Sequence, residues 1–260
     1  MTATYPGAVR SEWVKFRSLR SLAWTTLSLV LLMVGLGALF SFGRGREVGT
    51  AAPADQAGFD PTLTSLSGIL LAQIAVAVLG VLVITSEFAS GTIRPSLVGV
   101  PWRSRLLGAK AVMLTSVAFT VGAVAGLAAF LLGQPIISGQ NAPSAGLGDA
   151  GVLRAVLGTG LYLGATALLG LALGALIRST AGALTIVIVV MLTVPVFSSL
   201  LPQAAAEWVT KWWPSLAGMQ ILAVVQDPDG LTPWQGLGVL AGFAAVVLAA
   251  AFVVFRRRDV

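Results

Sequence analysis

The sequence predicts an all-α, polytopic membrane protein with six transmembrane helices. Of its 260 residues, 57% are hydrophobic and only 10% are charged, whereas charged residues make up about a quarter of a soluble domain. The mean hydropathy is +0.92. Six apolar segments are long enough for a helix to cross the bilayer, which takes about 20 residues. We therefore expect residues 1–260 to form a single transmembrane domain.

The six expected spans are 22–42, 63–85, 111–132, 152–177, 181–201 and 234–255. The first is longer than the 7 to 15 apolar residues of a signal-peptide core, and no small-x-small cleavage site follows it. We therefore expect it to stay in the protein as a membrane span.

The basic residues predict the orientation. If the N-terminus is cytoplasmic, most of the 16 Lys and Arg residues lie inside and most of the 10 acidic residues lie outside. Cytoplasmic segments of membrane proteins carry such an excess of Lys and Arg. We expect both termini and residues 87–110 to be cytoplasmic. Because the basic residues flank apolar spans, their expected partners are anionic membrane lipids and not nucleic acid.

Residues 8–20 predict an amphipathic helix that lies in the cytoplasmic membrane interface. Its apolar side carries Val9, Trp13, Phe16 and Leu19. Arg10 and Arg17 would reach lipid headgroups while the aromatic rings lie at the boundary. Glu12 falls on the apolar side, where it either pairs with Lys15 or contributes to a surface for a soluble partner.

The segment after the second span carries the pattern Glu87-x-x-x-Gly91-Thr92. A carboxylate, a flexible glycine and a hydroxyl at a helix end offer a soluble partner an acceptor, a turn and a donor. The alternative is that Glu87 caps the helix and Gly91 makes a turn.

Residues 101–110 predict a short helix parallel to the membrane, followed by a bend into the third span. Pro95 would end the preceding helix, and Pro101 suits a first helical turn. Arg103, Arg105 and Lys110 would then face either a partner or lipid phosphates.

The Glu-x-x-x-Gly-Thr pattern in this position resembles the type-2 ATP-binding-cassette (ABC) permease family, the membrane subunits of bacterial exporters that a separate ATPase drives. The resemblance implies that 8–20 is an elbow helix, with Glu12, Trp13 and Phe16 at the ATPase surface, and that 87–110 contains a coupling helix. The implied coupling residues are Glu87, Gly91, Thr92, Arg94, Arg103 and Arg105. It also implies a second permease copy, as a homodimer or a related heterodimer.

The sequence argues against catalysis by the chain itself. It has no Gly-x-x-x-x-Gly-Lys-Ser/Thr phosphate-binding loop, so ATP and Mg would bind the partner ATPase. It contains no Cys and no His, which removes thiol chemistry and the usual zinc ligands. We expect no catalytic residue, no bound cofactor and no metal site.

The centres of the spans contain no ionisable residue, which argues against proton-coupled transport. Sodium coupling through carbonyls and hydroxyls stays open. The polar residues that could line a translocation path are Gln73, Thr120, Thr159, Tyr162, Thr166 and Ser198. Four Gly-x-x-x-Gly pairs, starting at Gly122, Gly160, Gly170 and Gly238, indicate close helix packing, mostly within one subunit.

Residues 202–233 predict an external re-entrant or interfacial segment. Trp208 and Trp212 share a helix face, and the apolar run 216–225 is too short to cross the bilayer. The family resemblance implies that this segment is a lid over the exit route. The other external loops, 43–62 and 133–151, are rich in Gly and Pro and are expected to be flexible connectors.

These features predict an exporter permease for a hydrophobic or amphipathic substrate in a bacterial plasma membrane. A drug, lipid, peptide or pigment would fit equally well. The alternative is a membrane scaffold or assembly factor that recruits a soluble protein through the same basic loop and transports nothing.

Overall fold

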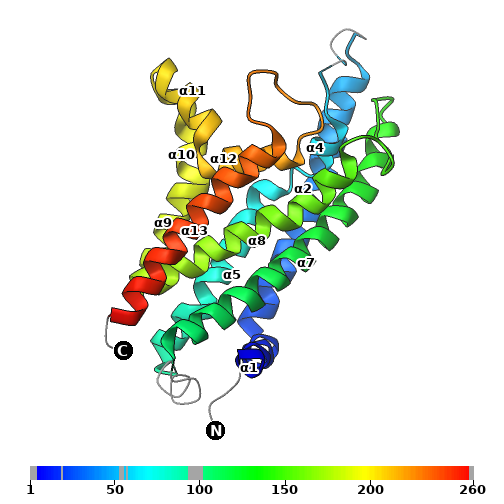
Figure 1. The fold of residues 1–260 in the computed structure, drawn as a ribbon. Coiled ribbons are helices and arrows are strands. Elements are labelled where there is room, and N and C mark those ends of the chain that lie inside the picture. The colour runs from blue at the N-terminus through cyan, green and yellow to red at the C-terminus, as the bar shows by residue number, and fades with distance from the viewer. Residues whose placement is uncertain (1–4, 19, 53–55, 57, 93–101, 258–260) are drawn as a thin grey trace.

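The chain folds into a bundle of long helices (Figure 1). The computed structural model describes residues 5–18, 20–52, 56, 58–92 and 102–257. Within these ranges all the regular structure is helical, and six helices are long and apolar enough to cross a membrane. This confirms the predicted all-α fold with six transmembrane helices.

The spans are α2 (Arg20–Gly49), α5 (Ile69–Ser90), α7 (Arg103–Ser138), α8 (Val152–Ile177), the compound fifth span Thr180–Leu200, and α13 (Pro233–Arg257). Helix α1 and the last turn of α13 lie at the same end of the bundle, at the bottom of Figure 1. We call this the terminal end and the opposite one the distal end.

Helices α8 and α5 form the centre of the bundle. In their most apolar stretches 72% and 67% of the residues are buried, against 17% in α13 and in the fifth span. The two helices cross at glycines, because a side chain on Gly80 would collide with the carbonyl oxygen of Ala167, and one on Gly170 with that of Ala77. Close backbone approach of this kind is how small residues hold membrane helices together.

Three of the four Gly-x-x-x-Gly pairs pack within the subunit as predicted. Gly122 faces Gly160, and Gly126 faces Thr159, where α7 meets α8. The pair on α13 is different, because a methyl group added to Gly238 or Gly242 would meet no atom within 4 Å among the described residues.

The boundaries of the first two spans differ from the sequence prediction. Helix α2 continues past residue 42 to Gly49, and an ion pair of 2.8 Å between Arg44 and Glu47 lies on its added turns. The second span begins at Ile69, because Leu63 belongs to the separate short helix α4 (Pro61–Ser65). Asp60 caps α4 by accepting a hydrogen bond from the Leu63 amide at 2.9 Å, as N-cap carboxylates do.

The prediction that 43–62 and 133–151 are flexible connectors is wrong for residues 43–49 and 133–138, which are helical. Helix α2 extends into the first segment and helix α7 into the second. Side-chain hydrogen bonds connect the two segments. Gln134 donates to the Pro61 carbonyl at 3.0 Å and accepts from the Ala145 amide at 2.8 Å. These contacts fix the distal end of the bundle.

The fifth span is not a uniform α-helix. It consists of α9 (Thr180–Ile188), the π-helix η1 (Val189–Thr193), α10 (Val194–Phe197) and the 3-10 turn η2 (Ser198–Leu200). The π-turn shifts carbonyls out of the usual hydrogen-bond ladder. Two side chains use them: Trp213 donates to the Val190 carbonyl at 2.6 Å, and Gln73 donates to that of Met191 at 3.5 Å.

The segment 202–233 contains α11 (Gln203–Trp212), α12 (Pro214–Met219) and the 3-10 turn η3 (Gln220–Leu222). Helix α12 and η3 are buried against α8 and α13, whereas Trp208 and Trp212 on α11 are exposed. Asp60 and Arg154 hold the chain that follows η3. Asp60 accepts from the amides of Val224 and Val225 at 2.6 and 2.9 Å, and Arg154 donates to the carbonyls of Ile221 and Ala223 at 3.2 and 2.8 Å.

Helix α1 (Tyr5–Ser18) covers most of the segment 8–20, where the sequence predicts an interfacial helix. Figure 1 views it nearly along its axis beneath α7, so it runs across the spans and not parallel to them. It packs against α7 and buries Ala8 and Glu12. Its position at a membrane surface stays a prediction.

The prediction of a separate short helix over 101–110 is wrong for residues 103–110. These residues are the first turns of α7, which is helical without interruption from Arg103 to Ser138. Residues 93–101 lie outside the described residues. Leu106, Leu107 and Ala109 are buried in the bundle, which favours extension of the span over a separate surface helix.

Candidate coupling site

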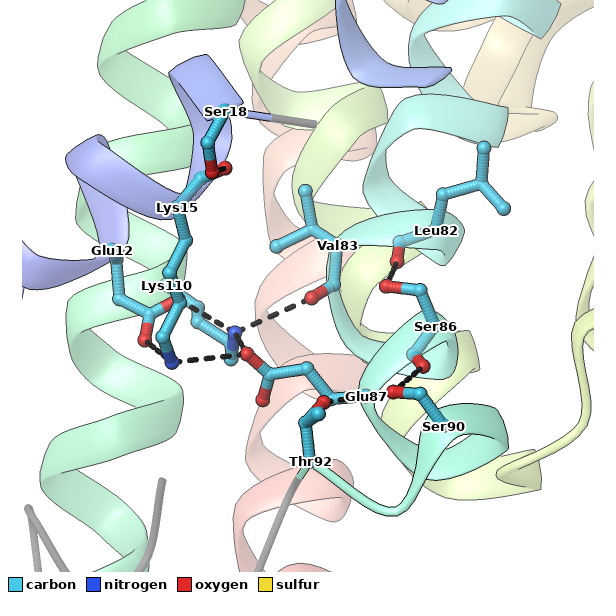
Figure 2. Close-up of polar contacts among 10 residues, drawn as sticks. All are labelled: Glu12, Lys15, Ser18, Leu82, Val83, Ser86, Glu87, Ser90, Thr92 and Lys110. Atoms are coloured by element: carbon cyan, nitrogen blue, oxygen red, sulfur yellow. Dashed lines mark hydrogen bonds and ion pairs between the residues drawn. The ribbon is translucent and has the colours of Figure 1, made fainter. Parts of the chain in front are cut away.

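Four charged side chains meet where α1, α5 and α7 come together at the terminal end (Figure 2). They are Glu12 and Lys15 from α1, Glu87 from α5 and Lys110 from α7. We call them the junction cluster. Two carboxylates and two ammonium groups make it electrically neutral.

Lys110 is the centre of the junction cluster. Its side chain is 1% exposed, and its Nζ donates to Glu12 Oε2 at 2.6 Å, to Glu87 Oε1 at 2.9 Å and to the Val83 carbonyl at 3.3 Å. All three donors of the ammonium group therefore have acceptors. This single cation links α7 to both α1 and α5.

Lys15 makes the second connection between the carboxylates. Its Nζ donates to Glu12 Oε1 at 2.8 Å and to Glu87 Oε1 at 3.1 Å, and its side chain is 37% exposed. Burial lowers the pKa of Lys15, but its hydrogen bonds to Glu12 and Glu87 and their charges outweigh this and raise the pKa above 10.5.

Glu87 lies where its own helix disfavours a negative charge, so its charge depends on its partners. It is in the last turn of α5, where the helix dipole is unfavourable to a carboxylate. Lys110 is the eighth residue of α7, beyond the first turn. Both are buried. Buried charges are tolerated when they are paired and hydrogen-bonded.

One acceptor of the junction cluster remains unused. Glu87 Oε2 is buried and has no hydrogen-bond partner among the described residues. A small cavity of about 20 Å³ is lined by the four residues of the cluster together with Phe16, Leu22, Val83, Ser86 and Met113. The cluster therefore offers one further carboxylate oxygen to a donor.

Gly91 makes a turn after Glu87, as one of the two alternatives from the sequence predicts. Gly91 ends α5 in the left-handed conformation, with φ of 70°, and its amide donates to the Phe88 carbonyl at 3.3 Å. Glycine adopts this conformation at little cost. The hydroxyl of Thr92 is hydrogen-bonded to that of Ser90 at 2.8 Å (Figure 2).

Arg105, a further predicted coupling residue, is not part of the junction cluster. Arg94 and the side chain of Arg103 lie outside the described residues. Arg105 stacks on Trp102, with 5.0 Å from the guanidinium carbon to the ring centroid. On α1, Trp13 and Phe16 stack at 6.1 Å between ring centroids.

The sequence singled out both carboxylates of the junction cluster and offered Lys15 as a partner of Glu12, but it did not predict that Lys110 pairs with them. The structure shows the Glu12–Lys15 pair that the sequence left as an alternative. The expectation that Lys110 faces a partner or lipid phosphates is wrong, because it is buried against Glu12 and Glu87. A signal was present: a lone lysine next to apolar residues, on the span that follows the one carrying Glu87.

The predicted translocation residues are mostly packed and internally bonded. Gln73, Tyr162, Thr159 and Thr166 are buried. Tyr162 donates to the Gln73 side-chain oxygen, and the two threonine hydroxyls bond back to carbonyls of α8. Thr120 and Ser198 likewise bond to carbonyls of their own segments. The role of these six residues in translocation stays a prediction.

The comparisons with known proteins identify the family. A comparison with curated proteins gives no match. The family model for "ABC-2 family transporter protein" matches residues 48–253, which is most of the chain and includes Glu87, Lys110 and the five spans from α5 to α13. A multi-pass helical bundle without an ATPase motif is the architecture expected of a transport subunit. The chain belongs to the ABC-2 family transporter proteins, as a permease subunit of an ABC transporter that is not itself an ATPase.

Proposed function

We propose that this chain is the permease of an ATP-driven exporter that moves a hydrophobic or amphipathic substrate across the bacterial plasma membrane. A separate ABC ATPase binds ATP and Mg and performs the hydrolysis. A second permease copy, identical or related, completes the pathway. Family membership and spans whose centres lack ionisable residues support this proposal.

The junction cluster is the observation that carries the proposal. The loop that includes residues 93–101 connects α5 to α7, and the cluster ties these two helices to each other and to α1 next to that loop. A force applied there by an ATPase would move the three helices together. A loop without such a tie would deform locally and transmit little to the spans.

The orientation in the proposal rests on charge. The terminal end carries α1, Lys110 and the basic last turn of α13, and it would face the cytoplasm under the positive-inside rule. The ATPase would then meet the terminal end, and the segment α11–η3 would lie outside the cell.

Co-purification tests whether an ATPase is the partner. The chain is expressed with its neighbouring reading frames, extracted in several mild detergents and recovered by an affinity tag. We expect a protein with a phosphate-binding loop to be recovered with it. Recovery of the permease alone in every detergent would favour the scaffold alternative.

Substitution of Glu87 tests whether the junction cluster transmits the coupling. Glu87→Gln keeps the size of the side chain but removes charge-assisted hydrogen bonds worth about 1.5–3 kcal/mol each. We expect ATP hydrolysis stimulated by the permease to fall about tenfold or more. The matched control is Glu47→Gln, because Glu47 pairs with Arg44 on the exposed surface of α2. Equal stimulation by the two variants would mean that Glu87 does not act in coupling.

A further inference from the structure

An open apolar groove runs between α1 and α7 on the outside of the bundle. It has a volume of about 350 Å³ and is lined by Val9 and Trp13 of α1 and by Val112, Met113, Ser116, Val117, Thr120 and Val121 of α7. Val112, Ser116 and Thr120 are exposed. The hydroxyls of Ser116 and Thr120 bond to carbonyls of α7, so they offer the groove few free polar groups.

The groove has the direction and length of a lipid chain. From Val112 to Val121, α7 rises about 14 Å at 1.5 Å per residue. One leaflet of the hydrocarbon core is about 15 Å thick. Because α1 crosses α7 at the terminal end, the groove starts at α1 and follows α7 toward the membrane interior.

Helix α1 carries two arginines, Arg10 and Arg17, on the side of the helix near Trp13. At about 100° per residue, Arg10 and Arg17 project within about 60° of Trp13 around α1, and they are about 10 Å apart along its axis. Both are exposed, and the junction cluster is already neutral without them. Within the described part of the chain, no carboxylate forms an ion pair with either arginine.

We propose that this groove is a binding site for an anionic membrane phospholipid. One acyl chain lies along α7 against Trp13, and the phosphate is held by Arg10 and Arg17. Guanidinium groups suit phosphate oxygens because they present a planar pair of donors. An aromatic ring on an interfacial helix fits the boundary between headgroup and chain.

The site would also stabilise the contact of α1 with the bundle. Met113 lines both the groove and the cavity beside Glu87, so a chain in the groove packs against the neighbours of the junction cluster. A bound anionic lipid would thereby hold α1 in place from its open side.

Photolabelling tests the position and the headgroup selectivity of the site. The purified permease is placed in phosphatidylcholine nanodiscs that contain a small fraction of phosphatidylglycerol with a diazirine in one acyl chain, and the adducts are mapped by mass spectrometry. We expect adducts at Trp13 and within 112–121, about tenfold more than with the matching phosphatidylcholine probe. Equal labelling by the two probes would overturn the proposal.

Two pairs of variants separate this site from general attraction to the membrane. R10Q/R17Q should reduce labelling by phosphatidylglycerol to the level of phosphatidylcholine, whereas R256Q/R257Q, which removes two charges from the same end of the bundle, should not. Ser116→Phe fills the groove and should abolish the adducts, whereas Val246→Phe on the exposed face of α13 should leave them unchanged.

The same variants show what would contradict the proposal. An equal loss in R256Q/R257Q would show that net charge attracts the lipid and the groove does not. Labelling that persists in Ser116→Phe would place the lipid elsewhere. Because the chain has no cysteine, Ser116→Cys can be crosslinked selectively, and an efficient crosslink between two permease copies would assign the groove to a protein interface instead.

Discussion

Lys110 joins three helices at the terminal end, because it lies on α7 and pairs with carboxylates of α1 and α5. It is buried against two carboxylates that belong to two other helices. Both carboxylates keep Lys15 as a partner, but Lys15 is partly exposed and cannot fill the space that the Lys110 side chain occupies. The packing and the charge balance of the junction therefore depend on the same residue.

Lys110→Met tests this dependence. Removing one partner of a buried ion pair costs about 3–5 kcal/mol, so we expect a clear fall in the thermal midpoint of the permease in detergent. Lys211→Met is the control, because Lys211 is exposed on α11, and it should shift the midpoint little. Adding Glu87→Gln to Lys110→Met should restore part of the loss, since it leaves one carboxylate, Glu12, for the one remaining cation of the cluster, Lys15. Equal midpoints for Lys110→Met and Lys211→Met would contradict the central position of Lys110.

The pKa of Lys15 predicts how the contact of α1 depends on pH. The folded pKa is raised above 10.5, so the contribution of this cation is fully present below pH 10.5 and is lost as the pH rises through its folded value. We expect α1 to stay in contact at neutral pH and to loosen at strongly alkaline pH. A fluorophore on Ser11→Cys, an exposed position of α1, reports the transition. The same alkaline transition in Lys15→Met would show that another group causes it.

The junction cluster could be predicted only in part. Glu12 and Glu87 stood out because carboxylates are rare beside apolar spans. Their pairing with Lys110 joins residues 98 and 23 positions apart and depends on how three helices meet. No local pattern in the sequence specifies that arrangement. The unused Glu87 Oε2 likewise becomes visible only when neighbouring atoms are placed.

At the scale of elements, the crossing of α5 and α8 sets how tightly the centre packs. Gly80→Val would force a side chain against the Ala167 carbonyl, and backbone cannot move aside as a flexible side chain can. Overpacking of this kind costs about 1–3 kcal/mol or more, so we expect a lower thermal midpoint. Gly242→Val on α13, where nothing lies within 4 Å, should be tolerated. Equal midpoints for the two variants would rule out a close crossing at Gly80.

Asp60 holds two elements together at the distal end, and Asp60→Ala should release one of them. Its carboxylate caps α4 and accepts both amides of Val224 and Val225. We expect hydrogen exchange in the η3 region to rise about tenfold or more. Asp149→Ala, which removes a bond to the Gly146 amide within its own loop, should leave that region unchanged. Unchanged exchange in Asp60→Ala would show that Arg154 alone holds the segment.

Hydropathy predicted the existence of all six spans, but it could not predict their ends or internal breaks. Helix α2 continues beyond its apolar run, where Val48 is buried in a cluster with Ile137 of α7, and α7 begins before its apolar run, where Leu106 and Leu107 are buried. The π-helix η1 contains Thr193 and is followed by Pro195, which has no amide hydrogen to donate to the Met191 carbonyl. Its stabilising contacts come from Trp213 and Gln73, which belong to other elements.

At the scale of the molecule, the bundle has two differently built ends. The terminal end is tied by charges on α1, α5 and α7, next to the loop where we propose that an ATPase acts. The distal end is tied by Asp60 and Arg154 to backbone groups after η3. An exporter must open its two ends in alternation. Such a cycle would have to keep or break these contacts at each end.

ATP-dependent flux tests the central claim most directly. Proteoliposomes that contain the permease and its co-purified ATPase are supplied with ATP or a non-hydrolysable analogue, with and without an uncoupler, and the movement of a hydrophobic fluorescent probe is followed. The account predicts flux with ATP, none with the analogue and no effect of the uncoupler, since the span centres contain no ionisable residue. Flux that continues without hydrolysis and stops with the uncoupler would contradict ATP-driven export and point to an ion-coupled pathway.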